Sequence, residues 1–126
     1  LFRNSSGPSV VAIKDSGGSI FGCFGTDTWH PQSKHYGNGQ CFLWKLDCES
    51  NEVIIYKSTG ENEYFQFSEP HFISMGCSDG NFGLYIDEQL LKGSSSKVTT
   101  FDNEILTTQK DFEIEGLEMW TFTNQK

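Results

Sequence analysis

Hydrophobic and polar residues alternate along this chain in short runs rather than in helical repeats. In residues 81–87 the side chains of Phe82, Leu84 and Ile86 fall on one face of an extended chain, which is the two-residue period of a β-strand. No stretch of about ten or more residues repeats with the period of an amphipathic helix. The pattern predicts a mostly β protein of short antiparallel strands, arranged as a sandwich or a barrel.

Turn residues separate these runs and set the order of the predicted elements. Residues 14–19 and 47–51 are rich in Gly, Ser, Asp and Asn, so each segment predicts a hairpin between its flanking runs. The last run changes its apolar face at Gly116, which predicts a β-bulge. The predicted strands are residues 10–13, 20–25, 40–46, 52–58, 64–67, 71–75, 81–87 and 111–122.

Three connecting segments are predicted to be more than simple turns. Residues 26–39 contain proline, histidine and glycine without any period, which predicts a long surface loop. Residues 88–93 predict one short helical turn that ends at Gly93. Residues 94–101 are polar and have a preference for extended structure.

Composition narrows the class of protein without identifying a function. The chain has 126 residues, which favours one domain, and its 11 phenylalanines can fill one compact core. Its 17 acidic and nine basic residues give a net charge of −8, which disfavours binding to nucleic acid or to anionic lipid. No apolar run approaches the roughly 18 residues of a membrane-spanning helix, so we expect no membrane insertion.

The chain contains four cysteines, at positions 23, 41, 48 and 77. Two disulfides are one arrangement that an even number allows. A ring-rich chain of this length does not need such cross-links, and three of the cysteines lie in apolar runs. We therefore expect free, mostly buried thiols and a reducing, cytoplasmic environment.

One short motif suggests catalysis, and its context argues against it. Residues 76–80 fit the Gly-x-Ser-x-Gly pattern that presents a nucleophilic serine, here Ser78. That motif needs a helix after the serine and a histidine later in the chain, whereas residues 81–87 alternate like a strand. All three histidines precede Ser78. Asp79-Gly80 is a typical hairpin dipeptide, so the motif predicts a glycine-rich β-turn.

The sequence also gives little support for a metal site, a cofactor site or a reactive thiol. His30, His35 and Cys41 lack the close ligand pairs of a zinc site, so we predict no metal and no cofactor. Cys77 is the cysteine expected to be most exposed, but the acidic Glu69 and Asp79 nearby would raise the pKa of its thiol. The residues provide no credible catalytic set, and we expect a protein that is not an enzyme.

Several weak motifs in a fixed order carry more information than any one of them. The chain contains Phe-Gly at 21–22, Trp29, Tyr-Gly-x-Gly at 36–39 and Thr-Gly-x-Asn at 59–62. Further along it contains Phe-x-Leu-x-x-Asp at 82–87, Thr-Phe-x-Asn at 100–103 and Leu-Glu-x-Trp at 117–120. Together these motifs resemble the TLDc domain of oxidation-resistance proteins, over nearly the whole chain.

The resemblance implies an antiparallel two-sheet β-sandwich with a few short peripheral helices. Residues 1–126 would then be a single TLDc-like domain that lacks its N-terminal portion, because residues 1–4 resemble the end of the family's first conserved block. We expect another segment of a longer parent chain, or a partner, to cover the sheet edge left open. The sequence departs from the family at three places, which are residues 77–79, Gln40 and Val98.

The resemblance also implies a function in protection against oxidative stress without an established catalytic mechanism. It implies binding to the vacuolar-type proton pump, the V-ATPase, at the cytosolic face of organelles. Two alternatives remain, a structural accessory domain in a cytoskeletal or membrane-trafficking assembly and a thiol-based antioxidant that uses Cys77. The residues carried over as interaction or structural determinants are Gly22, Trp29, Gly37, Gly39, Gly60, Asn62, Gly76, Gly80, Asp87, Gly93, Phe101, Asn103, Glu118 and Trp120.

Three of these residues lead to more specific expectations about burial. We expect the rings of Trp29 and Trp120 to lie in the core, where aromatic side chains bury most area. Glu118 lies between two apolar residues and beside Trp120. Its carboxylate is therefore either on the exposed side of an edge strand or hydrogen-bonded inside the domain.

Overall fold

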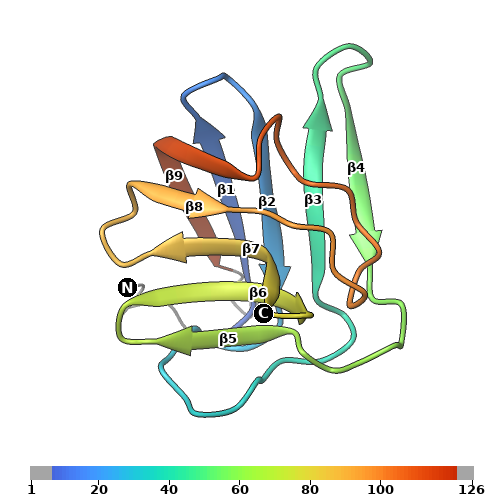
Figure 1. Cartoon of the computed structure of the whole chain (residues 1–126), viewed down its shortest axis with the longest axis vertical. Helices are drawn as coiled ribbons and strands as arrows, with labels where there is room; N and C mark the ends of the chain where they lie inside the picture. Colours follow the sequence, from blue (N-terminus) through green and yellow to red (C-terminus); the bar gives the residue numbers. More distant parts are fainter. Residues whose placement is uncertain (1–6, 122–126) are drawn as a thin grey trace, which may run out of the picture.

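The computed structural model describes residues 7–121, and these residues form nine β-strands (Figure 1). All strand pairs are antiparallel, as the alternating pattern predicts. No helix occurs between residues 7 and 121, so the expected short peripheral helices are not confirmed. The strands are β1 (Ser9–Asp15), β2 (Ile20–Gly25), β3 (Phe42–Asp47), β4 (Glu52–Lys57), β5 (Gln66–Glu69), β6 (Phe72–Ser78), β7 (Asn81–Asp87), β8 (Lys92–Ser94) and β9 (Asp111–Thr121).

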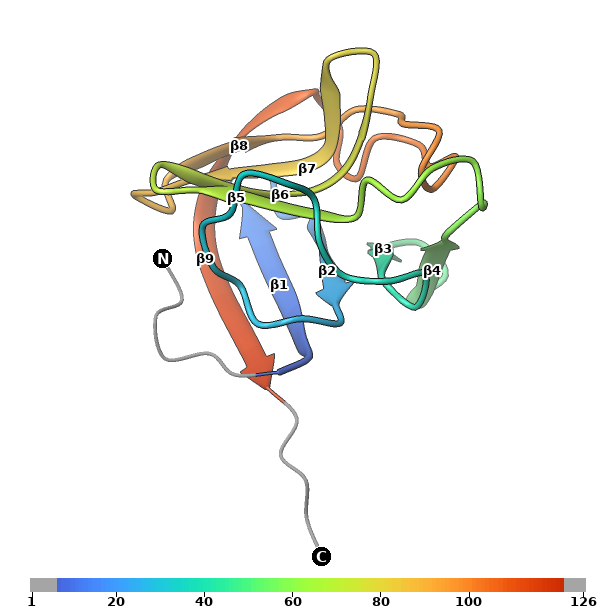
Figure 2. The same cartoon turned by 90° about the horizontal axis from the view of Figure 1, so that it is seen from below.

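The strands belong to one hydrogen-bonded sheet rather than to two separate sheets. Their order is β4-β3-β2-β1-β9-β8-β7-β6-β5. Strand β9 belongs to both halves, because it pairs with β8 through residues 111–113 and with β1 through residues 114–121. The sheet folds along β9, and the half formed by β5 to β8 lies over the half that contains β1 and β2 (Figure 2). The two-sheet arrangement that we expected is therefore not confirmed.

A bulge in β9 lets one strand serve both halves of the sheet. Lys14 of β1 faces Gly116, whereas the next residue, Asp15, faces Ile114, so Glu115 is the extra residue. An extra residue shifts the alternation by one position. Phe112 and Leu117 consequently both contact the core although their parity differs. The predicted change of face at Gly116 is confirmed, and Phe122, the last residue of the predicted strand, lies outside the described residues.

Two turns show where local sequence was informative and where it was not. Asp79 and Gly80 join β6 to β7 with φ of 53° and 78°, the left-handed geometry that a two-residue hairpin turn requires. The predicted turn is confirmed, although Cys77 lies in β6. The segment after β7 is a tight turn in which the N–H of Leu90 donates to the carbonyl of Asp87, at 3.1 Å. The helical turn predicted there is wrong, because the chain reverses into β8.

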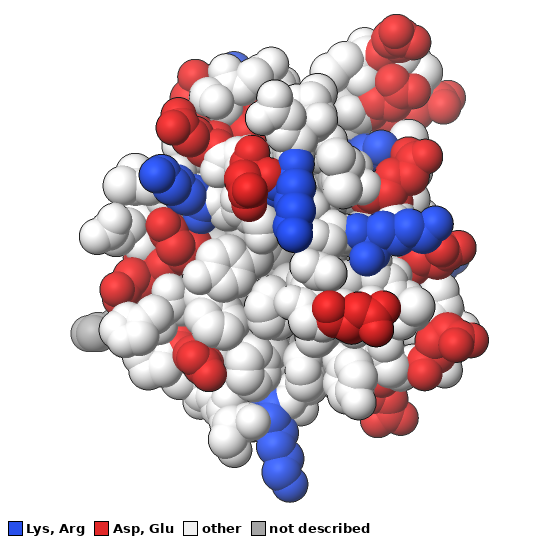
Figure 3. Space-filling model, viewed as in Figure 1, with Lys and Arg blue, Asp and Glu red and all other residues white. Residues whose placement is uncertain are grey.

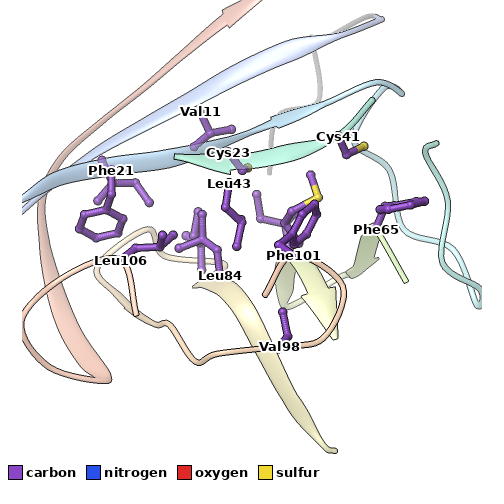
Figure 4. Packing of buried hydrophobic residues seen from close by; sticks show 14 of the residues in the cluster. Val11, Phe21, Cys23, Cys41, Leu43, Phe65, Leu84, Val98, Phe101 and Leu106 are labelled. Atoms are coloured by element: carbon purple, nitrogen blue, oxygen red, sulfur yellow. The ribbon is translucent and has the colours of Figure 1, made fainter. Parts of the chain in front are cut away.

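The core lies between the two halves of the sheet (Figure 4). Val11, Phe21 and Leu43 enter it from one half and Leu84 from the other, each at most 1 % exposed. The irregular segment between β8 and β9 adds Val98, Phe101 and Leu106, so it is packed as tightly as the strands. Trp29 is buried as expected, and its indole N–H donates to the hydroxyl of Ser9, at 3.1 Å.

The prediction that Trp120 lies in the core is wrong. Its side chain is 62 % exposed, because the bulge in β9 directs residues 117 and 119 inward and residues 118 and 120 outward. Glu118 lies on the same outer side and is also exposed, but β9 lies between β1 and β8 and is not the edge strand that we expected.

Gly22 provides a test of how closely the strands approach one another. A Cβ atom at this position would lie 1.7 Å from the carbonyl oxygen of Val11 and 3.1 Å from the Trp44 ring. We expect Gly22→Ala to lower the free energy of unfolding by more than about 2 kcal/mol, because backbone has to move. Gly116→Ala is the matched control, since nothing lies within 4 Å of its Cβ position. Urea denaturation of both variants measures the difference, and equal midpoints would contradict this packing.

Candidate functional site

Three motifs that lie far apart in the sequence meet on one side of the molecule. We call this the motif cluster and define it as Thr59, Asn62, Gly76, Cys77 and Thr100. The backbone N–H of Thr59 donates to the carbonyl of Thr100 at 3.0 Å. The Thr59 hydroxyl donates to the carbonyl of Thr99 at 2.6 Å. The Thr-Gly-x-Asn and Thr-Phe-x-Asn motifs are therefore in direct contact.

Thr100 is the centre of the motif cluster and is completely buried. Its hydroxyl lies 2.9 Å from Asn62 Oδ1 and 3.1 Å from the carbonyl oxygen of Cys77, and either oxygen can accept its proton. The same hydroxyl accepts the backbone N–H of Cys77 at 3.1 Å. One buried side chain thereby links the loop before β5 to the end of β6.

Gly76 fits this arrangement because no side chain could occupy its place. Its φ is 79°, and a Cβ atom would lie 2.8 Å from the Phe101 ring and 3.1 Å from Val98. Its backbone N–H donates to the carbonyl of Phe65 at 2.7 Å. The glycine at the start of the 76–80 motif thus allows close packing, whereas the one at its end forms the turn.

The motif cluster organises the backbone and contains no arrangement for nucleophilic catalysis among the described residues. Ser78 accepts the backbone N–H of Thr99 at 3.0 Å, which gives its hydroxyl a structural role. Burial raises the pKa of the Cys77 thiol above its ordinary value, so the reactive thiolate is disfavoured. Cys48 is the exposed cysteine and Cys77 is only partly exposed, which corrects the expected order. All four cysteines are free, and Cys23 and Cys41 are buried.

Gln66 is a central polar residue that the sequence reasoning missed. The alternation in residues 64–67 placed it on the same face as Tyr64, yet its side chain is completely buried. Its amide accepts the N–H of Asp27 and donates to the carbonyl of Asp27, each at 3.0 Å. Its backbone exchanges two hydrogen bonds of 2.8 Å with Tyr36. The predicted loop 26–39 is thus fixed to β5 at both ends.

The sequence feature that pointed to a buried polar residue was the long loop 26–39 and not the strand that contains Gln66. A long loop packed against a core leaves backbone N–H and C=O groups that need partners. A side-chain amide can satisfy one group of each kind. The sequence could show that such a residue was needed, but not which of the polar residues supplies it.

The other predicted residues lie outside the motif cluster and also have structural contacts. The Asp87 carboxylate accepts the N–H of Leu91 at 3.0 Å in the turn after β7. The buried Asn103 amide donates to the carbonyls of Ser96 and Glu104, at 3.0 and 2.8 Å. Gly93 lies in β8 beside the Phe112 ring, Phe101 is in the core, Gly37 and Gly39 lie in the loop before β3, and Gly60 has a φ of 85°.

The electrostatic surface is acidic, with few basic side chains. Acidic side chains gather over the turn between β3 and β4, at the upper right of Figure 3. Residues 7–121 contain no group of three or more His, Cys, Asp or Glu side chains placed to hold a metal ion. Within the same residues no helix has the length and apolar character needed to cross a membrane.

Comparison with known proteins gives a consistent result. The family model described as TLDc domain matches residues 2–123. Oxidation resistance protein 1 of Kluyveromyces lactis is 37% identical over 130 residues, covering 88% of this chain and 52% of that protein. Its counterpart in Yarrowia lipolytica is 40% identical over 113 residues, covering 88% of this chain and 48% of that protein. The chain thus spans about half the length of these relatives.

A third relative is a much longer protein than the two oxidation resistance proteins. Nuclear receptor coactivator 7 of Mus musculus is 35% identical over 125 residues, which cover 97% of this chain and 13% of that protein. The same domain therefore occurs within proteins of very different size.

The central role of Thr100 can be tested by removing only its hydroxyl. We expect Thr100→Val to lower the free energy of unfolding by about 1–3 kcal/mol, because the backbone N–H of Cys77 loses its acceptor and Asn62 Oδ1 loses one of its hydrogen bonds. The same change at the exposed Thr108 is the matched control and should stay within about 0.5 kcal/mol of the unmodified chain. Thermal and urea unfolding measure both, and equal losses would contradict the central role of Thr100.

Proposed function

The chain belongs to the TLDc domain family, and from that premise we propose that it is a non-catalytic protein-interaction module acting in protection against oxidative stress. The printed names of two relatives, each oxidation resistance protein 1, support the biological process. The chain covers about half of those relatives, so the activity of a whole oxidation resistance protein is part of the proposal.

The observation that carries the non-catalytic role is the use of polar atoms in the motif cluster. The side chains of Asn62 and Thr100 form hydrogen bonds with one another and with the backbone of Cys77. A catalytic set needs a nucleophile within reach of a base and aimed at open space. The residues of the family motifs instead hold irregular segments in fixed positions, which suits a module that presents a rigid surface.

The partner we propose is the V-ATPase, at the cytosolic face of organelles. Its support is the family resemblance, because several TLDc proteins bind this pump. An acidic domain whose irregular segments are held by hydrogen bonds of Thr100 and Gln66 is suited to docking on a large complex without changing shape. A structural accessory role in another assembly would use the same rigidity with a different partner.

Capture of the pump tests the proposed partner. We expect the immobilised 126-residue chain to enrich V-ATPase subunits from a eukaryotic cell lysate, as measured by quantitative mass spectrometry. An unrelated β-domain with the same net charge is the control, because an acidic surface alone attracts basic proteins. Enrichment of cytoskeletal or trafficking proteins without pump subunits would support the accessory role and contradict this partner.

The thiol alternative predicts a different result and rests on the exposed Cys48 and the partly exposed Cys77. We expect the purified chain to consume hydrogen peroxide no faster than the double variant Cys48→Ser/Cys77→Ser, because burial raises the pKa of the Cys77 thiol. The measurement is peroxide loss per mole of protein at neutral pH. A rate that falls by about tenfold or more in the double variant would favour a thiol antioxidant over a non-catalytic module.

A further inference from the structure

The single sheet ends at β5 on one side and at β4 on the other (Figure 1). The end at β5 is covered by the loop that follows β2. Tyr36 and Gln66 exchange two backbone hydrogen bonds of 2.8 Å. Further along the same loop, the N–H of Gln32 donates to the carbonyl of Ser68 at 3.1 Å. A backbone segment therefore lies along β5 in the manner of an additional strand.

The end at β4 has no such cover within residues 7–121. There the backbone of β4 pairs with β3 and with no other segment. In a strand with one neighbour, alternate residues direct their N–H and C=O groups away from the sheet. The six residues from Glu52 to Lys57 thus leave about three residues whose backbone groups can pair with a further strand. We call this row of groups the open edge.

The open edge lacks the features by which natural proteins protect such strands. Edge strands are commonly interrupted by a bulge or a proline, or carry charged side chains. The six pairs of β3 and β4 follow one another without a register shift, and residues 52–57 contain no proline. The centre of the strand consists of Val53, Ile54 and Ile55, which are 56 %, 37 % and 48 % exposed. A regular, apolar edge of this kind is a template for pairing with another polypeptide.

Acidic side chains at one end of the open edge indicate a basic residue in its occupant. Glu52 faces Asp47 of β3, so two carboxylates lie opposite one another on the same side of the sheet. Lys45, which also lies on that side, is paired with Glu104 at 3.1 Å. Like charges directly opposite one another are destabilising. A cation placed opposite Glu52 by an added strand would reduce this repulsion.

The other end of the open edge indicates an acidic residue. Lys57 pairs with Phe42 and lies on the opposite side of the sheet from Glu52. It is exposed, and no ion pair within residues 7–121 includes it. Val53 and Ile55 lie on the same side as Lys57. The best complement is therefore a strand with an acid opposite Lys57, apolar residues at the centre and a base at its other end.

A second copy of the chain does not meet these requirements. When two identical strands pair antiparallel, the twofold axis is perpendicular to the sheet, so residues that face one another share one side. Glu52 and Lys57 lie on different sides and cannot face one another across such a pair. Each copy also has a charge of −8, so electrostatic repulsion opposes their association. The charges thus favour a different polypeptide.

We propose that the open edge binds an extended segment of a partner polypeptide as an additional antiparallel strand. The segment has an acidic residue opposite Lys57, β-branched residues opposite Val53 and Ile55, and a basic residue opposite Glu52. An antiparallel direction continues the pairing found throughout the sheet. This inference rests on the proposed function as an interaction module, and it names the surface and the chemistry of the partner.

Designed peptides test the open edge independently of the pump. The first probe is Ser-Asp-Thr-Val-Thr-Val-Lys-Ser, which places aspartate opposite Lys57 and lysine opposite Glu52 when it pairs antiparallel. The second probe exchanges its aspartate and lysine. Two further probes keep the first sequence and carry N-methyl groups on alternate residues, so that each loses the hydrogen-bond donors along one edge only. NMR titration measures the affinities, and amide hydrogen exchange locates the contact.

We expect the first peptide to bind at least about fivefold more tightly than the charge-exchanged peptide, because the latter opposes like charges at both ends. One N-methylated peptide should bind like the first, since its blocked edge faces solvent, and the other should lose binding. Alternate amides of β4 should exchange rapidly in the free chain and at least about tenfold more slowly with the first peptide bound.

A variant of the open edge provides a second, independent measurement. We expect Val53→Lys combined with Ile55→Lys to weaken binding of the first peptide by about tenfold or more, because lysine on an edge strand opposes further pairing. Both side chains are exposed, so the variant should remain folded. Leu91→Lys is the matched control, since Leu91 is 57 % exposed but lies between β7 and β8. It should leave the affinity unchanged.

Four outcomes would overturn the proposal. Equal binding of both N-methylated peptides would show that backbone pairing is not involved, and equal binding of the charge-exchanged peptide would contradict the register. Slow exchange of all β4 amides in the free monomer would mean that the chain covers its own edge. A dimer in sedimentation that the double lysine variant dissociates would assign the edge to a second copy. If the first peptide binds as expected and the pump is not captured, the open edge stands and the proposed pump partner is wrong.

Discussion

The double pairing of β9 is the constraint on which the rest of the structure depends. Residues 111–113 belong to one half of the sheet and residues 114–121 to the other, so the two halves cannot separate without losing the pairing of β9 with β8 or with β1. The bulge at Glu115 keeps apolar side chains directed inward on both sides of the fold. The core between the halves, with Phe21 against Phe112 at a centroid distance of 4.9 Å, follows from this geometry.

Two buried polar residues attach the irregular segments of the chain to the strands. Thr100 fixes the segment between β8 and β9 to the end of β6, and Gln66 fixes the loop after β2 to β5. Each side chain satisfies backbone groups that would otherwise be buried without partners. The domain is therefore held rigid by polar contacts in the segments where it has no regular structure.

This division of roles gives the family motifs a physical meaning. The motif residues build the interior and the turns, whereas the side of β9, β1, β2, β3 and β4 that faces away from the core carries partly exposed apolar side chains together with Lys14, Lys57 and Glu118. Glu118 and Trp120 belong to one motif and are exposed on that side of the sheet. A rigid scaffold that presents such a face is consistent with an interaction module.

The sequence by itself determined every strand except the short β8, the Asp79-Gly80 turn, the bulge near Gly116 and the family, because alternation and turn chemistry are local properties. Tertiary structure alone decided that one sheet forms instead of two, since that depends on which strands pair with β9. It also decided the burial of Gln66 and Thr100 and the exposure of Trp120. Burial of a side chain depends on contacts between residues far apart in the sequence, which no local pattern specifies.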